Sequence, residues 1–342
     1  MDLDIKYIKI SIFLLKKIIG MTFPNPPVVS LIVESNLRKT YNKIVSFGYT
    51  FEGGRPHAEA VALRKINFKK KYHYTLYSTL EPCCHHGREE SCVSKILKSK
   101  INRVVFSLRD PDKRVNGLGE KILKNNGLEV LGGILTEETK RIYNGYILNR
   151  KFNRPKVTLK IGSSLDNKIS SKQNKTDKIT NDQVKKIVHI MRSEADAILV
   201  GKNTVHVDNP KLNCRIEGLK KFSPIRIILS KKLDFNLNSY IFKNCKITPT
   251  IIFTLENKNQ IIKKIEEKKV KIFILDKKMF TLSNIIQELA KLGVCNLFVE
   301  GGGEVFTSFL NEGLVDRLII FRSNFLIGSK GINAFNILKN KK

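Results

Sequence analysis

The chain has 342 residues, 42% of them hydrophobic and 27% charged, which is the composition of a folded globular protein long enough for two domains of common size. No apolar run reaches the roughly twenty residues of a membrane helix, so we expect no membrane-spanning segment. The formal net charge is +31, but the lysines are dispersed along the chain, which favours a solvated basic surface over a nucleic-acid-binding stripe.

The first apolar stretch, residues 7–19, contains lysines at 9, 16 and 17, and no small-residue cleavage site follows it. It therefore predicts an N-terminal packing helix and not a signal peptide. Three of the six cysteines lie within the ten residues 83–92, which indicates metal binding in a reducing compartment more than disulfides. We expect a cytoplasmic protein.

Short apolar runs then alternate with amphipathic segments, a β/α pattern. In the first half these segments are 28–33, 60–66, 74–78, 93–97, 103–107, 121–125 and 129–132. A helical pattern directly follows His57-Ala58-Glu59, and the strand at 75–78 ends at Glu81-Pro82. Both polar motifs thus lie where a strand or loop meets a helix.

A second series begins after Pro155. Its candidate strands are 156–161, 197–200, 225–229, 250–254, 271–275, 296–299 and 317–321, and helical patterns occur at 182–193, 282–291 and 305–312. The polar residues around 149–155 predict a boundary there. We expect an α/β protein with one domain over 1–149 and a second over 154–342.

His57, Cys83 and Cys92 supply one imidazole and two thiolates, which predicts a three-ligand zinc site with its fourth position open for water, as in catalytic sites. Zinc lowers the pKa of bound water, and Glu59, two residues from a ligand, is the candidate for moving protons. If Cys83 begins a helix after Pro82, the exposed amides and the positive end of the helix also favour its thiolate form. Each residue alone could be a packed core residue, but the combined His-x-Glu and Pro-Cys pattern is typical of zinc deaminases.

Nucleic-acid deaminases space their cysteines as Pro-Cys-x-x-Cys. Here position 86 is histidine and the next cysteine ligand is Cys92, which argues against an editing deaminase.

Further on, an apolar strand is followed by Glu300 and three glycines. Such a turn allows close approach of a phosphate, but by itself it is more often a tight strand-to-helix connection.

Several motifs resemble the bifunctional riboflavin-biosynthesis deaminase and reductase family over nearly the whole chain. In the first half they are PNP at 24–26, GGRPHAE at 53–59, TLEPCCHHGR at 79–88 with Cys92, and DP at 110–111 followed by VNGLG at 115–119. In the second half they are LK at 159–160 with SLD at 164–166, DAILVG at 196–201, TV at 204–205, DNP at 208–210 and VEGG at 299–302.

The resemblance implies a cytidine-deaminase-like three-layer α/β/α domain followed by a dihydrofolate-reductase-like α/β domain. It implies zinc-dependent deamination of a diaminopyrimidinone ribosylamino phosphate, NADPH reduction of the ribosyl chain to ribityl, and self-association into a homo-oligomer. It assigns substrate contacts to Asn25, His85 and Arg88 in the first site. In the second site it assigns Lys160, Thr180, Asp208, Arg215 and Glu300 to the substrate, and Gly201, Thr204, Gly301 and Gly302 to NADPH.

The chain departs from the family pattern at Val29, Thr50, Asn167, Lys178 and Asn213. It also ends at Lys342, which predicts a C-terminally short reductase domain with an exposed sheet edge. Two alternatives therefore stay open: a deaminase with a degenerate second domain, and a basic RNA-editing deaminase. Asn167 is expected to occupy a turn with positive φ, which asparagine tolerates.

Overall fold

The computed structural model describes residues 2–36, 40–85, 87, 89–172 and 177–335. The chain forms two compact units, one ending at Asn153 and the other beginning at Arg154. Each is described here by itself. Among these residues, no helix combines the length and the apolar character needed to cross a bilayer.

The first unit is built on a five-stranded sheet with the order β2-β1-β3-β4-β5. Its strands are β1 (Val29–Ser35), β2 (Asn42–Tyr49), β3 (His73–Leu80), β4 (Arg103–Leu108) and β5 (Glu129–Gly132). The β1 strand pairs antiparallel with β2 and β3, whereas the β3–β4 and β4–β5 pairs are parallel.

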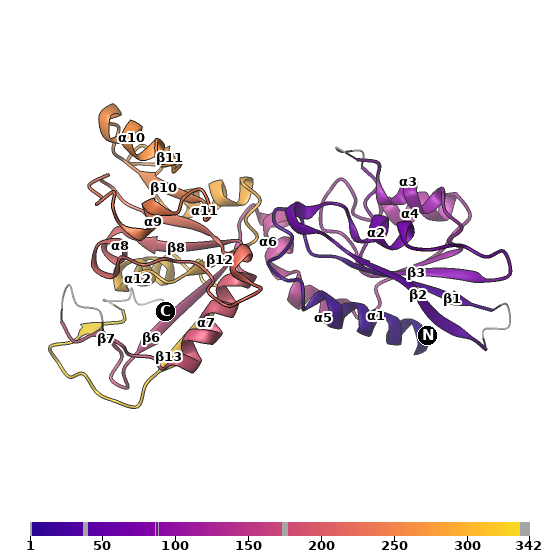
Figure 1. Ribbon diagram of the computed structural model, residues 1–342, viewed down its shortest axis with the longest axis horizontal. Helices are drawn as coiled ribbons and strands as arrows, with labels where there is room; N and C mark the ends of the chain where they lie inside the picture. The colour runs from indigo at the N-terminus through magenta and orange to yellow at the C-terminus, as the bar shows by residue number, and fades with distance from the viewer. Residues whose placement is uncertain (1, 37–39, 86, 88, 173–176, 336–342) are drawn as a thin grey trace. The chain divides into compact units, whose positions relative to one another are not determined.

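Helices cover both faces of this sheet, which gives three layers (Figure 1). The helices are α1 (Asp2–Leu15), η1 (Glu52–Gly54), α2 (Ala58–Arg64), α3 (Cys92–Leu97), α4 (Leu118–Asn125), α5 (Thr136–Ile142) and α6 (Asn144–Phe152). Buried residues of α2, α3 and α4 share one core with β1, β3 and β4. The expected N-terminal packing helix is present as α1, which buries Ile8, Ile12 and Leu15.

The second unit has a seven-stranded parallel sheet with the order β11-β10-β9-β8-β12-β6-β13. Its strands are β6 (Lys156–Ser163), β8 (Ala197–Gly201), β9 (Ile225–Leu229), β10 (Thr250–Thr254), β11 (Lys271–Ile274), β12 (Asn296–Val299) and β13 (Arg317–Arg322). A separate two-stranded sheet joins β7 (Lys168–Ser170) to β14 (Ile332–Asn333).

Helical segments connect these parallel strands, as parallel pairing requires. They are α7 (Asp182–Glu194), α8 (Lys202–Asp208), η2 (Lys220–Phe222), α9 (Tyr240–Lys243), α10 (Asn259–Glu266), α11 (Leu282–Lys291) and α12 (Gly303–Asn311). Because neighbouring parallel strands end at the same edge of the sheet, the segments after β8, β9 and β12 come together there.

Two expectations about the second unit can be compared with this structure. Asn167 has a φ of 60°, as expected for a turn residue in the left-handed region. The β13 strand lies at the edge of the sheet within the described residues, with Leu318 and Ile320 exposed.

Lys160 lies on β6, where buried and half-buried residues alternate, so it points to the face opposite Leu159 and Ile161.

Candidate active sites

The three predicted metal ligands meet at one end of the first unit. His57 occupies the N-cap position of α2, Cys83 lies in the loop after β3, and Cys92 is the first residue of α3. The α3 start is fixed by Ser91, whose Oγ accepts a hydrogen bond from the Ser94 N–H at 3.1 Å. The ends of two helices and one strand therefore position the site.

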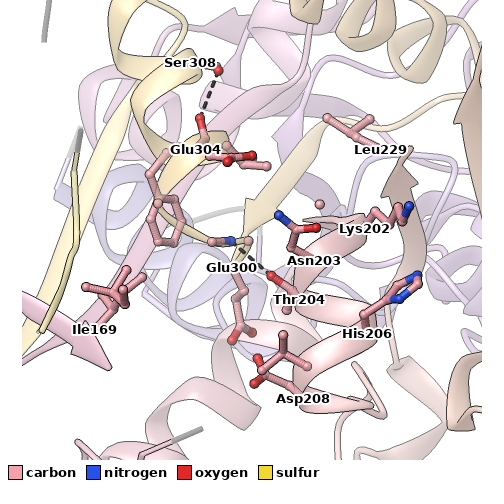
Figure 2. Close-up of a pocket in the computed structure, with 18 of the residues that line it drawn as sticks. Ile169, Lys202, Asn203, Thr204, His206, Asp208, Leu229, Glu300, Glu304 and Ser308 are labelled. Atoms are coloured by element: carbon pink, nitrogen blue, oxygen red, sulfur yellow. Dashed lines mark hydrogen bonds between the residues drawn. The ribbon is translucent and has the colours of Figure 1, made fainter. Parts of the chain in front are cut away.

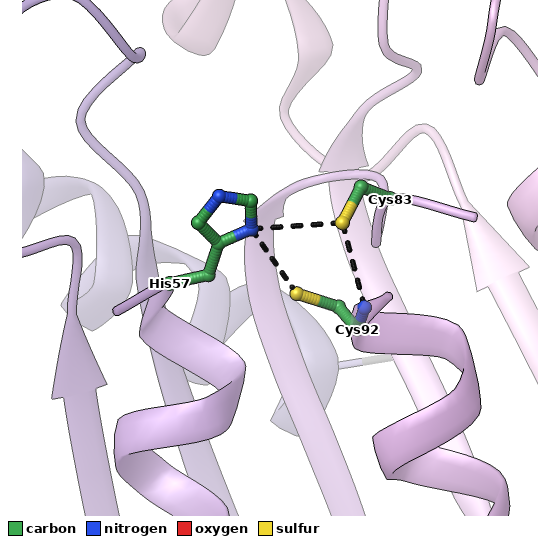
Figure 3. Close-up of side chains that lie close together, drawn as sticks. All are labelled: His57, Cys83 and Cys92. Atoms are coloured by element: carbon green, nitrogen blue, oxygen red, sulfur yellow. Dashed lines mark hydrogen bonds between the residues drawn. The ribbon is translucent and has the colours of Figure 1, made fainter. Parts of the chain in front are cut away.

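The ligand atoms have the spacing of a tetrahedral metal centre (Figure 3). Nδ1 of His57 lies 3.5 Å from Sγ of Cys83 and 3.4 Å from Sγ of Cys92. Ligands of zinc at bond lengths of about 2.1 Å for nitrogen and 2.3 Å for sulfur would stand about 3.6 Å apart. Both nitrogen–sulfur distances therefore match a zinc site, and all three ligand atoms lie within 4.8 Å of one another.

Cys83 does not begin a helix, so the condition under which a helix end would favour its thiolate is not met. Residues 81–84 form a loop, and the helix begins nine residues later at Cys92, where Ser91 supplies a cap. Cys83 is held instead by the start of α3, because its carbonyl accepts from the Val93 N–H at 3.1 Å and its Sγ accepts from the Cys92 N–H at 3.4 Å.

The two thiols influence each other's ionisation. Hydrogen bonding from Cys92, with a further contribution from His57, lowers the pKa of Cys83 to about 4 despite burial, whereas the same pairing raises the pKa of Cys92. One thiolate is thus present at neutral pH, and metal binding would release the second proton.

Glu59 lies in the first turn of α2 and is buried, with 4% of its surface exposed. Its Oε2 is 3.3 Å from Sγ of Cys92. Burial raises the pKa of this carboxyl, and the Cys83 thiolate raises it further. A carboxyl with a raised pKa beside a metal centre is suited to accepting and returning a proton.

Two of the substrate-contact candidates are connected to the segments that carry the metal ligands. The Asn25 amide donates to the Gly54 carbonyl at 2.9 Å, three residues before His57. His85, two residues after Cys83, has a buried Nδ1 with no hydrogen-bond partner in the described part of the chain. Arg88 lies outside the described residues.

A cavity of about 1650 Å³ opens in the second unit at the carboxyl ends of the parallel strands. Its volume exceeds that of a pocket for one drug-sized molecule, which is about 300–1000 Å³. Of the predicted reductase-site residues, Lys160, Thr180, Gly201, Thr204, Asp208, Glu300, Gly301 and Gly302 line it. Arg215 does not line the cavity, but its charge is close enough to Arg192 for the pKa of Arg215 to be lowered by burial and by that neighbour.

Glu300 forms the charged centre of this cavity (Figure 2). Its carboxylate accepts from Lys160 Nζ at 3.0 Å and from Arg192 Nε at 2.7 Å. Burial opposes the ionisation of Glu300, but these two cations outweigh it and lower its pKa to about 2. The cluster carries one net positive charge, which suits an anionic ligand. Arg192 was not predicted from the sequence, because a single arginine on the amphipathic helix α7 is indistinguishable from a surface charge.

The glycines at the ends of β8 and β12 allow these strands to approach closely. A Cβ on Gly301 would lie 3.0 Å from the Gly201 nitrogen, and one on Gly201 would lie 2.9 Å from a methyl of Val305. The Gly302 N–H is not free, since it donates to Thr204 Oγ1 at 3.1 Å. Glycine at positions 201 and 301 is therefore required by local packing at the cavity, whether or not these residues contact a ligand.

The comparisons with known proteins match both units. A family model described as the cytidine and deoxycytidylate deaminase zinc-binding region matches residues 1–108, and one described as the RibD C-terminal domain matches residues 155–339. The riboflavin biosynthesis protein RibD of Aquifex aeolicus (strain VF5) is 38% identical over 96% of this chain and 88% of that protein. RibD of Bacillus amyloliquefaciens is 32% identical over 94% of this chain and 85% of that protein.

Solved structures of similar proteins superpose on nearly the whole chain. RibD of Acinetobacter baumannii superposes with a TM-score of 0.88 at 27% identity and covers 99% of this chain and 91% of its own. A Thermotoga maritima protein described as a diaminohydroxyphosphoribosylaminopyrimidine deaminase and 5-amino-6-(5-phosphoribosylamino)uracil reductase has a TM-score of 0.81 at 30% identity, with 97% and 90% covered.

The metal centre, the cavity and these matches together define a zinc-dependent deaminase domain joined to an NADPH-dependent reductase domain. The chain belongs to the RibD family of riboflavin biosynthesis proteins. It is a bifunctional deaminase and reductase, as the sequence predicts, and the expected cytidine-deaminase-like and reductase folds are confirmed. The deaminase-only and RNA-editing alternatives are set aside by these matches.

Proposed function

We propose that this enzyme deaminates 2,5-diamino-6-ribosylamino-4(3H)-pyrimidinone 5′-phosphate and then reduces the ribosyl side chain of the product to ribityl with NADPH. The observation that carries the deaminase half is the position of the Glu59 carboxylate, 3.3 Å from a thiol of the metal centre. The printed description of the Thermotoga maritima relative names the same pair of reactions.

In the deaminase site we assign His57, Cys83 and Cys92 to zinc. A zinc ion held there supplies Lewis-acid activation of a water molecule. Glu59 accepts a proton as the water attacks the amino-bearing ring carbon, and it delivers a proton to the departing amino group. Ammonia leaves and a ring carbonyl remains. Asn25, His85 and Arg88 are the proposed substrate contacts.

In the reductase site we assign Lys160, Thr180, Asp208, Arg215 and Glu300 to the sugar phosphate. NADPH, when bound, supplies the hydride, and Gly201, Thr204, Gly301 and Gly302 line its place in the cavity. Ion pairs with Glu300 fix the positions of Lys160 and Arg192. The net positive charge of the three side chains attracts the phosphorylated substrate.

The test follows ammonia release and NADPH oxidation together, with zinc-loaded protein and the diaminopyrimidinone substrate. Glu59→Gln is expected to abolish ammonia release while leaving reduction of separately supplied deaminated product intact. Lys160→Met is expected to do the reverse. Cys84→Ser, whose thiol contacts the Arg114 carbonyl and not the metal ligands, is the matched control. Ammonia release without NADPH oxidation by the unaltered protein would contradict the second half of the proposal.

We further propose that the enzyme works as a homo-oligomer in the cytoplasm. The family resemblance supports self-association, and the six free cysteines suit a reducing compartment. Sedimentation of the purified protein tests the first statement, and fractionation of cells tests the second.

A further inference from the structure

Two lysines at the end of the cavity next to β9 have no acidic partner within the described part of the chain. Lys231 and Lys232 directly follow β9, and both line the cavity and are exposed. Among the described residues neither ammonium group forms an ion pair or a side-chain hydrogen bond. Two adjacent cations left unneutralised at a ligand cavity indicate that an anionic group of the ligand binds there.

The backbone that carries these lysines is held in place. The Ser230 N–H donates to the Phe253 carbonyl at 3.0 Å, and Thr254 Oγ1 donates to the Lys231 carbonyl at 3.4 Å. The Ser230 hydroxyl donates to the Lys232 carbonyl. The lysine side chains therefore project from a fixed turn, which reduces the entropy lost on binding.

The nearby acid does not oppose an anion. Asp234 forms an ion pair with Lys202 at 2.6 Å, so the local charge of that pair is balanced. Lys202 and His206, which also line the cavity, lie on the opposite side of Thr204 from Ile169 in Figure 2. The Lys202–Asp234 pair adds no net charge, so Lys231 and Lys232 give the end of the cavity next to β9 its net positive charge.

The distance from the glutamate cluster suits the far end of a dinucleotide. In the sheet, β9 is separated from β6 by β8 and β12, so Lys231 follows a strand three spacings, or about 14 Å, from the strand of Lys160. Leu229, Leu282 and Ile285 form an apolar wall of the same cavity, suited to an adenine ring. The cofactor's adenosine end would therefore lie near β9 when its nicotinamide lies near Lys160.

We propose that Lys231 and Lys232 bind the 2′-phosphate of NADPH and make this domain discriminate NADPH from NADH. The proposal rests on the assignment of this cavity to the cofactor. The 2′-phosphate is the only chemical difference between the two cofactors, and ammonium groups bind phosphate oxygens through charge-assisted hydrogen bonds.

The test measures equilibrium binding, by nicotinamide fluorescence, of NADPH and NADH to the zinc-loaded full chain. In Lys231→Ala/Lys232→Ala we expect the Kd for NADPH to rise by about 10- to 100-fold, as for the loss of one or two charged hydrogen bonds, while the Kd for NADH changes less than about twofold. Adenosine 2′,5′-bisphosphate should lose affinity in parallel, whereas adenosine 5′-monophosphate should not. Lys231→Arg/Lys232→Arg should retain the preference.

The matched control is Lys243→Ala/Lys246→Ala, which removes two exposed charges that do not line the cavity. It should leave both constants unchanged. Equal weakening of NADPH and NADH, or no weakening of either, would overturn the proposal while leaving the cofactor assignment intact. Failure of the unaltered protein to bind NADPH at all would overturn the cofactor assignment and this proposal with it.

Discussion

The backbone N–H of Cys92 points at Sγ of Cys83, and these two atoms are 3.4 Å apart. Although eight residues separate the two cysteines in the sequence, both sulfurs face Nδ1 of His57. A spacing of nine positions therefore achieves the ligand arrangement that other zinc deaminases obtain from two cysteines three positions apart.

Cys92→Ser is expected to reduce bound zinc and to abolish ammonia release, because a serine hydroxyl is a much poorer ligand than a thiolate. Cys84→Ser should retain both the metal and the activity, since its Sγ lies 3.4 Å from the Arg114 carbonyl, outside the ligand cluster. Metal content is measured by atomic emission after dialysis. Equal zinc loss in the two variants would contradict the assigned ligand set.

Glu59→Gln is expected to reduce ammonia release by at least about 10²-fold, the lower end of what a general acid–base residue contributes. The variant should still bind zinc, because the carboxylate is not one of the three clustered ligand atoms. Single-turnover ammonia release and metal analysis are measured on the same preparation. A variant that loses its zinc would indicate that Glu59 holds the metal and does not move protons.

Asp110 is expected to make the deaminase domain less stable as the pH rises from about 4 to about 7. Burial raises its pKa from 3.8 to about 7, against the opposing effect of hydrogen bonds from Asp112 and Tyr146. Between these values the unfolded chain has lost the proton that the folded chain retains, so folding is disfavoured progressively and the loss is complete above pH 7. The difference corresponds to about 4 kcal/mol at most.

Asp110→Asn should remove this pH dependence, because the amide oxygen can still accept from the Tyr146 hydroxyl at 3.0 Å. Urea unfolding of both proteins at pH 5 and pH 8 measures the effect. The asparagine variant should gain stability relative to the unaltered protein at the higher pH. Parallel pH profiles for the two proteins would show that Asp110 ionises normally.

Arg192→Leu is expected to destabilise the reductase domain by less than the roughly 3–5 kcal/mol that follows when a buried charge loses its only partner, because one cation still pairs with Glu300. Glu300 would then keep only Lys160. Arg215→Leu, which removes an exposed guanidinium nearby, should cost far less. Urea unfolding followed by circular dichroism compares them. Because the pKa of Glu300 is lowered from 4.5 to about 2, the stabilisation that the intact cluster gives through Glu300 should be complete above about pH 4.5, decrease progressively below it and be lost near pH 2.

The sequence by itself determined the chemistry and most of the elements. Ligand type and order identify the zinc centre, because metal preference depends on the atoms offered. The strands β9 and β10 begin and end at the predicted residues, since a short apolar run bounded by polar residues is a local signal. The edge strand β2 was missed, because its apolar residues Ile44 and Phe47 lie at exposed positions, as Lys43 does, and so do not mark a buried face.

Only the tertiary structure decided which distant side chains meet. Arg192 reaches Glu300 across 108 positions of sequence, and the Gly302 N–H is taken by Thr204 across 98. Neither pairing has a local signal, because the first depends on α7 packing against β12 and the second on β8 and β12 being neighbours in the sheet. Strand order is fixed by the packing of whole elements around a common core, so contacts at the ends of the strands follow from the fold and not from the pattern of residues within any one segment.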